Sequence, residues 1–286
     1  MRLGQFRGHG SRMMHPNLET GLVFLVGVLA ACTLFNEAAA AARVVSLDQC
    51  ADQYVLALAP RESIVGLSHR ADDADSRLRT MAKGLPTIRV KAESLLAARP
   101  DTAVRYWGGD ARLERALQAH GVRVVQIRDA EDFAGIRRNI RVVAGALDAT
   151  PRGEALIRRM DSQLASASGA WDGRSALYLT PSGFTAGDGT LIGAMMKAAG
   201  LKNAARRPGY SAAPLESLVL SPPRGYVLGF FDQLSAAFER WGMGRHASLK
   251  RQFPGRQIAA LPGSILSCPA WFAADGVEIL SKSARR

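Results

Sequence analysis

The stretch Glu93-Ser94-Leu95-Leu96, followed by Pro100 and Val104, occurs a second time as Glu216-Ser217-Leu218-Val219, followed by Pro223 and Val227. Each copy predicts a short helix that begins at an acidic residue, ends before proline and leads into an apolar strand, because proline cannot continue a helix. The two strands are expected at 102–107 and 225–231. The copies lie too far apart for a solenoid repeat, so they indicate two α/β lobes of similar construction with a cleft between them.

The order of the other predicted elements is typical of lobes with mainly parallel sheets. Two β-rich runs at 43–47 and 63–67 lie on either side of a helical pattern at 52–59, and this strand, helix, strand order is the signature of a parallel crossover. A helix at 110–120 and an apolar run at 122–127 complete the first lobe. The second lobe is predicted to begin with a strand at 176–179, a glycine-rich turn at 181–189 and a helix at 190–199.

The lobes are expected to be joined by a helix. Apolar residues recur at three- and four-residue steps at 133–147, and Pro151 opens a second helix whose apolar stripe continues to about Ser168. No Gly/Ser-rich or charged linker separates the halves, and a helical connection permits only modest hinge motion. We therefore expect a first lobe at 43–150, a connecting helix at 151–170 and a second lobe at 171–286.

Residues 1–42 have the pattern of a secretory signal peptide. Three arginines precede an apolar run at 22–31, and small residues at 38–42 offer a cleavage site. A membrane anchor is the alternative, but the run is shorter than the ~20 apolar residues that a span requires. The stretch Leu29-Ala30-Ala31-Cys32 also resembles a lipobox, so lipid attachment through Cys32 stays open. The expected location is periplasmic.

The chain is strongly basic, with a formal net charge of +12. Nucleic-acid binding is not indicated, because the charges are scattered through amphipathic segments without zinc-finger spacing or an aromatic RNA-binding motif. Attraction to an anionic ligand or to the acidic cell envelope is one interpretation, and a generally soluble basic surface is the other.

Cys50 and Cys268 are the cysteines that remain after residue 42. They could pair in an oxidising compartment, but the sequence cannot show that their Cα atoms approach within disulfide range. A disulfide, two buried free thiols and a role at a ligand site all stay open.

An enzyme is not expected from the motifs. Ser182 does not lie in a GxSxG elbow, and no HExxH or paired-cysteine zinc spacing occurs. The histidines after residue 42 are His69, His120 and His246, which lie far apart in sequence. A zinc or manganese carrier stays an alternative, because metal ligands that are far apart in sequence can converge in space. An envelope enzyme or a cofactor-binding protein on a similar two-lobed scaffold is the other alternative.

In order along the chain, the segments 43–48, 52–58, 63–68, 93–101, 121–124 and 184–187, together with Glu216, resemble the class III periplasmic substrate-binding proteins of ABC importers. The likeness extends over essentially all of the chain after residue 42. It implies an α/β fold of two Rossmann-like lobes with mainly parallel sheets joined by a single long helix. It also implies a monomer without catalytic residues, bound cofactor or metal site of its own, which carries a metal chelate (corrinoid, siderophore or haem) to an ABC permease dimer in the inner membrane.

By the same resemblance, Glu93 and Glu216 correspond to two surface glutamates that dock onto arginines of the permease. One carboxylate on each lobe would give a basic partner two points of attachment. The alternative is a local role, since a glutamate in the first turn of a helix complements the helix dipole by ~0.3–1 kcal/mol.

The resemblance places ligand contacts in loops at the carboxyl ends of strands. Aromatic side chains there suit a large chelate, although core packing is the alternative for each of them. Arg70 either pairs with an anionic group of the ligand or is a solvated neighbour of Asp72 and Asp73. Relatives often carry a Gly-Gly-Pro-Arg-like stretch where this chain has residues 269–272, so a cationic contact is missing there. The expected ligand-binding residues are Gln49, Cys50, His69, Arg70, Tyr106, Trp107, Phe184, Trp271 and Phe272.

Overall fold

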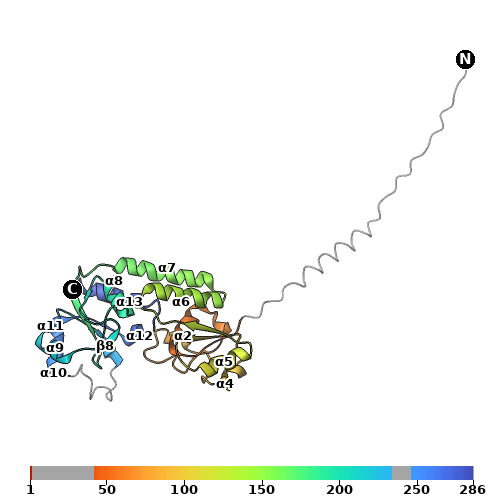
Figure 1. The fold of residues 1–286 in the computed structure, drawn as a ribbon. Helices are drawn as coiled ribbons and strands as arrows, with labels where there is room; N and C mark the ends of the chain where they lie inside the picture. The colour runs from red at the N-terminus through yellow and green to blue at the C-terminus, as the bar shows by residue number, and fades with distance from the viewer. Residues whose placement is uncertain (2–41, 234–245, 286) are drawn as a thin grey trace. The chain divides into compact units, whose positions relative to one another are not determined.

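The computed structural model describes residue 1, residues 42–233 and residues 246–285 (Figure 1). The expected signal peptide, its cleavage site and Cys32 lie outside the described residues. None of the helices within the described ranges is both long and apolar enough to cross a membrane.

The first lobe is built on a parallel sheet in the order β2-β1-β3-β4. Alternate residues of each strand point to opposite faces, and both faces are apolar, so helices cover the sheet on both sides. Val44 and Val104 face one cluster of buried side chains, while Val45 and Ala103 face another. The strands are β1 (Val44–Ser46), β2 (Ile64–Gly66), β3 (Thr102–Tyr106) and β4 (Arg123–Ile127).

The helices of this lobe divide between the two faces. On one face pack α2 (Gln49–Leu58) and α6 (Phe133–Ala146), and on the other α4 (Ala92–Ala97) and α5 (Ala111–Ala119). Two short helices, η1 (Arg61–Ser63) and α3 (Arg79–Ala82), lie in the connections.

The second lobe repeats this plan with the strand order β10-β9-β5-β7, again parallel. Its strands are β5 (Ser175–Leu179), β7 (Lys202–Asn203), β9 (Tyr226–Gly229) and β10 (Gln257–Leu261). One face packs against α8 (Leu191–Ala198) and α13 (Ala273–Ser283), and the other against α9 (Leu215–Leu220), α10 (Ala247–Lys250) and α11 (Phe253–Arg256). The elements η2 (Phe231–Gln233) and α12 (Gly263–Leu266) follow β9 and β10. Two lobes with parallel sheets are thereby confirmed.

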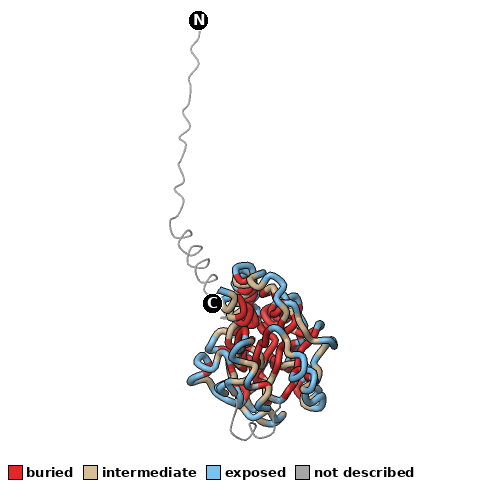
Figure 2. Tube along the Cα trace, turned by 90° about the vertical axis from the view of Figure 1, so that its left-hand side faces the viewer, coloured by how far each residue is buried: buried red, intermediate tan, exposed pale blue. Residues whose placement is uncertain are grey.

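The long helix α7 (Thr150–Ala167) joins the lobes. It packs against α6 of the first lobe and α13 of the second, as Figure 1 shows. Gly153 lets α7 approach α6 closely, because a Cβ there would come within 2.6 Å of the Ala144 Cβ. Ile157 and Met160 of α7 belong to a buried cluster that continues through both lobes, and Figure 2 shows such buried residues gathered in the interior. The connection therefore is a packed part of the core.

Two predicted boundaries are wrong. The glycine-rich stretch at 181–189 contains a strand, β6 (Phe184–Ala186), which pairs antiparallel with β8 (Tyr210–Ala212), a partner that no local pattern reveals. Helix α2 begins at Gln49 and not at Asp52, because the Asp48 carboxylate accepts hydrogen bonds from the N–H groups of Cys50 and Ala51. The prediction overlooked Asp48 as an N-cap.

Asp52 is fully buried beneath the carboxyl ends of β1 and β2. Its carboxylate accepts hydrogen bonds from the hydroxyl of Ser46, from the Ser68 N–H at 2.9 Å and from the Ser68 hydroxyl at 2.6 Å. Burial raises the pKa of Asp52 to about 6, although these hydrogen bonds act to lower it. The first lobe therefore contains a carboxylate that is costly to ionise.

This cost predicts how stability changes with pH. Because the folded-state pKa lies above the unfolded value of 3.8, the folded protein holds the proton more tightly, and the contribution of Asp52 to stability falls as pH rises through about 6. We expect Asp52→Asn to remove this fall and to raise the free energy of unfolding at pH 7.5 by up to ~3 kcal/mol. Urea unfolding from pH 4 to pH 8 measures the free energy of unfolding of each variant, and Asp72→Asn, at an exposed position, is the control. Parallel profiles for wild type and Asp52→Asn would contradict the expectation.

Candidate ligand-binding site

Two adjoining cavities lie where the carboxyl ends of the strands meet the seam between the lobes. The first, of about 460 Å³, is formed by the loops that follow β1, β2 and β3, with Ser267 from the second lobe. The second, of about 400 Å³, lies between the loop after β4 and the segments of the second lobe around Thr190, Tyr210 and Ile265. Tyr106 and Ser267 line both cavities, which together we call the cleft.

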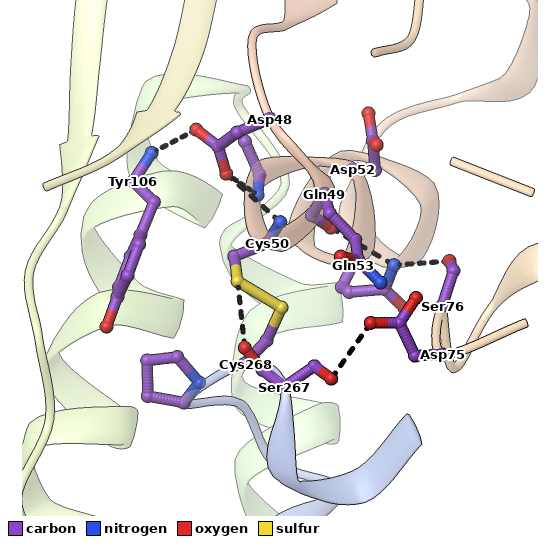
Figure 3. The surroundings of a disulfide bond; sticks show 12 residues. Asp48, Gln49, Cys50, Asp52, Gln53, Asp75, Ser76, Tyr106, Ser267 and Cys268 are labelled. Carbon is purple, nitrogen blue, oxygen red and sulfur yellow. Dashed lines mark hydrogen bonds between the residues drawn. A yellow bond between two sulfur atoms is a disulfide. The ribbon is translucent and has the colours of Figure 1, made fainter. Parts of the chain in front are cut away.

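Asp48 organises the wall of the first cavity. Besides capping α2, its carboxylate accepts a hydrogen bond from the Tyr106 N–H at 2.6 Å, which ties the loop after β1 to the end of β3 (Figure 3). The Tyr106 hydroxyl in turn donates to Asp129 at 2.6 Å, across to the second cavity. Burial and this hydrogen bond raise the pKa of Tyr106 above its ordinary value, so the phenol keeps its proton.

A disulfide joins the lobes beside the cleft. Cys50, at the start of α2, is bonded to Cys268, which lies between α12 and α13, and their Cα atoms are 5.3 Å apart (Figure 3). The sequence left open a disulfide, two buried free thiols or a role at a ligand site, and the structure shows the disulfide. Sulfur atoms in a disulfide are not thiolates, so neither cysteine is available in this state as a metal ligand.

Other contacts between the lobes surround the disulfide. The buried Tyr54 hydroxyl donates to the Pro269 carbonyl at 2.7 Å, and the Ser267 hydroxyl donates to Asp75 at 3.2 Å. Arg77 forms an ion pair with Asp275 at 2.5 Å. The segment after α12 is thus attached to the first lobe at several points, which hold the two sides of the seam together beside the cleft.

Gln49 places an unsatisfied donor at the first cavity. The side chain is 6% exposed, and its Nε2 has no hydrogen-bond partner among the described residues. An unpaired buried donor costs free energy unless a ligand or water accepts its hydrogen bond. The Gln49 amide therefore contributes a buried, unpaired N–H group to the wall of the first cavity.

Comparison with known proteins agrees with this geometry. The family model described as periplasmic binding protein matches residues 44–222, more than half of the chain. The chain belongs to this family. No curated protein gives a significant match.

Solved structures share the fold of this periplasmic binding protein. The periplasmic heme-binding protein HutB of Vibrio cholerae has a TM-score of 0.68 and 18% identity over 85% of this chain and 98% of that one. The periplasmic heme-binding protein BhuT, solved with two hemes, has a TM-score of 0.65 and 24% identity over 85% of this chain and 97% of that one. The periplasmic vitamin B12 binding protein BtuF of Vibrio cholerae has a TM-score of 0.57 and 18% identity over 85% and 96%.

Family membership confirms several expectations. Periplasmic binding proteins are substrate-binding components of ABC transporters and act in the periplasm, so the protein is a binding protein and not an enzyme. Which substrate it binds is a separate question, because the likeness to the solved structures shows the fold alone at these identities.

Six of the expected ligand-binding residues line the cleft of the periplasmic binding protein. His69 and Trp107 are exposed at the first cavity, and Arg70 forms ion pairs there with Asp73 at 2.8 Å and Asp75 at 3.2 Å. The partners of Arg70 thus include Asp73, as one interpretation held, but not Asp72. The six are Gln49, Cys50, His69, Arg70, Tyr106 and Trp107.

The other three aromatic residues line neither cavity. Phe184 is 51% exposed on β6, whereas Phe272 is 3% exposed within the core. Trp271 packs edge-to-face against Tyr54, with ring centroids 5.4 Å apart, and against Phe272 at 5.5 Å. The segment that carries both residues lies against the first lobe, which turns their rings into the core.

The cleft also contains residues that the sequence analysis missed. Asp129 and Glu131 follow β4 directly, so the rule that sites lie at the carboxyl ends of strands would have found them. Tyr210, 64% exposed, lies on β8, whose pairing with β6 had no local signal.

The two repeat helices expose their glutamates. Glu93 and Glu216 are exposed in the first turns of α4 and α9, while Leu95 and Leu218 of the same repeats are buried beneath them. In Figure 1 both helices lie on the side opposite α7. Each lobe thus has one exposed glutamate, and the helices that carry the two glutamates lie on the same side.

Proposed function

We propose that this periplasmic binding protein captures a metal chelate (cobalamin, a ferric siderophore or haem) in the cleft and delivers it, as a monomer, to an ABC permease dimer in the inner membrane. Residues 1–42 would direct export. The observation that carries the proposal is the pair of adjoining cavities with exposed aromatic rings. Proteins named for haem and vitamin B12 share the fold and support this class of cargo.

The size and surface of the cleft suit a large, partly apolar ligand. Cavities of about 300–1,000 Å³ are typical of small-molecule sites, and the two adjoining cavities of 460 and 400 Å³ lie within that range. Trp107 is 54% exposed and Tyr210 64%, which leaves ring surface uncovered at both cavities. Aromatic rings bury much area on a flat ligand at little cost in side-chain entropy.

Charged residues of both signs line the first cavity, whereas the described lining of the second contains only acidic ones. Asp48, Asp110 and Glu114 line the first cavity together with Arg70 and Arg105, and Arg105 is paired with Glu114 at 2.7 Å. Asp129 and Glu131 line the second cavity. Opposite charges attract and like charges repel across short distances, so an anionic group of the chelate is expected beside Arg70, with the rest of the ligand extending past Tyr106 into the second cavity.

Titration of the protein with haem, cobalamin, and ferric hydroxamate and catecholate siderophores tests the proposal. We expect one of these ligands to quench tryptophan fluorescence at micromolar concentration, because Trp107 lies at the first cavity. Trp107→Phe should lose much of the quenching. Absence of binding by every ligand in an independent calorimetric titration would overturn the proposal.

The orientation of the chelate gives a further prediction. For a chelate with free carboxylates, such as haem, Arg70→Gln is expected to weaken binding by about tenfold, since hydrogen bonds to charged groups contribute ~1.5–3 kcal/mol. The exposed Arg112→Gln on α5 is the matched control, as it removes the same charge outside the cleft. Equal affinity of the two variants would show that the anionic group lies elsewhere.

A free-metal carrier is the weaker candidate. Among the residues that the structure describes, no three His, Cys, Asp or Glu side chains come together as a metal site. Zinc and manganese sites in proteins require several such ligands within coordination distance. A chelate brings most of its own ligands, so a cleft without such a cluster can still bind it.

We also propose that Glu93 and Glu216 dock the loaded protein onto the permease. Both are exposed, one on each lobe, and the helices α4 and α9 that carry them lie on the same side in Figure 1, so both can meet one basic partner. A two-point contact between carboxylates and arginines would set the orientation in which the cleft faces the permease.

A further inference from the structure

A basic hollow lies at the far end of the second lobe from the cleft. It has a volume of about 770 Å³ and is lined by Trp171 and three arginines, Arg174, Arg224 and Arg256, together with Asp172 and two glycines. These residues precede β5, β9 and β10, so they lie at the amino edge of the sheet, whereas the cleft lies at its carboxyl edge. Five-residue strands such as β5 separate the two sites by about 15 Å.

The register of the parallel strands brings the three arginines together. Leu177 pairs with Tyr226, and Gln257 pairs with the same Tyr226, so the residues just before these strands lie side by side. Neighbouring strands are ~4.8 Å apart. The backbones that carry the three guanidinium groups are therefore close neighbours, although the residues are far apart in sequence.

The backbone on either side of the hollow is well anchored. The turn that carries Trp171 donates hydrogen bonds from Gly169, Trp171 and Gly173 to the carbonyls at the end of α8, at 2.8–3.1 Å. Two prolines, at 222 and 223, fix the φ angles of the segment that leads to Arg224. The guanidinium of Arg174 lies over the ring of Trp171, 5.2 Å from its centroid, which favours one orientation of that side chain.

These arginines have no carboxylate partner. Elsewhere Arg105, Arg137 and Arg141 each form an ion pair, but within residues 42–233 and 246–285 none joins Arg174, Arg224 or Arg256 to an acidic side chain. Asp172 is the sole acidic residue among the described residues of the lining. Three cations that share a hollow repel one another, so a bound anion would relieve that repulsion.

We infer that this basic hollow binds a phosphate-bearing anion. Guanidinium groups form paired hydrogen bonds that match phosphate oxygens, and the contact of Arg174 with Trp171 reduces the freedom which that side chain loses on binding. Several arginines around one hollow favour an anion with more than one charge. A soluble organic phosphate and a phospholipid headgroup present the same chemistry.

Binding of pyrophosphate by calorimetry, and of phosphatidylglycerol vesicles by sedimentation, tests the inference. The variant Arg174→Gln/Arg224→Gln/Arg256→Gln is compared with Arg138→Gln/Arg158→Gln/Arg159→Gln, which removes the same charge from exposed positions on α6 and α7. We expect the first variant to bind at least about tenfold more weakly than wild type and the second to bind like wild type. Circular dichroism and chelate binding check that both variants fold.

The two probes separate the sources of the phosphate. Loss of pyrophosphate binding in the first variant supports a soluble anion, and loss of vesicle binding alone supports a lipid headgroup. Equal weakening in the two variants would show that only the overall basic charge attracts the anion, and would overturn the inference. Failure of the wild type to bind either probe would overturn it as well.

Discussion

Exchange of both Glu93 and Glu216 for lysine is expected to reduce uptake of the cargo to background while leaving its affinity for the binding protein unchanged. The two residues are exposed on separate lobes, on α4 and α9, and neither lines the cleft. Like charges brought together at an interface cost several kcal/mol, so two lysines facing permease arginines would prevent docking. Uptake by cells that carry the cognate permease, together with a titration of the purified variant, measures both quantities.

A matched control removes the effect of net charge. Glu62→Lys/Asp188→Lys also reverses one exposed carboxylate on each lobe, and it should transport at the wild-type rate. If the Glu93 and Glu216 variant lost affinity for its cargo in proportion to uptake, the glutamates would act within the fold, as helix-dipole partners, and the docking proposal would fail.

Removal of the disulfide between the lobes is expected to have the largest effect on stability. Cys50 and Cys268 are 218 residues apart in sequence, and the chain-entropy model gives about 5 kcal/mol for a loop of that length. We expect Cys50→Ser/Cys268→Ser to lower the melting temperature by about 10–20 °C. Because Cys50 and Ser267 line the first cavity, weaker binding of the chelate is expected as well.

The reduced wild-type protein is the control for this variant. A phosphine reductant should bring the melting temperature of the wild type down to that of the double variant and should not change the variant itself. A double variant that melts within about 2 °C of the oxidised wild type would show that the contacts of Tyr54 and Arg77 across the seam suffice to hold the lobes.

Local chemistry made most elements predictable. The apolar runs around Val44 and Val104 and the proline after each repeat are properties of neighbouring residues, so the strands and short helices could be placed to within a few residues. The helix that crosses between the lobes was predicted at 151–170 and observed at Thr150–Ala167, because Pro151 and an apolar stripe mark it. The family resemblance added how these elements are assembled.

The parts of the site that the sequence could place follow strands directly. His69, Arg70 and Trp107 each lie in a loop just after a strand, and Gln49 begins the helix that follows β1; all four line the first cavity. Asp129 follows the same rule and was overlooked. The direction of a strand is thus enough to say at which edge of the sheet a side chain will lie.

The sequence by itself determined two similar α/β lobes, the helix between them and the exposed glutamate of each repeat, since these depend on residues a few positions apart. Only the tertiary structure decided that Cys50 meets Cys268, that Trp271 and Phe272 turn into the core, and that three arginines share one hollow. Each of these outcomes depends on how distant segments are brought together by packing and strand register, and no local pattern of side chains encodes that arrangement.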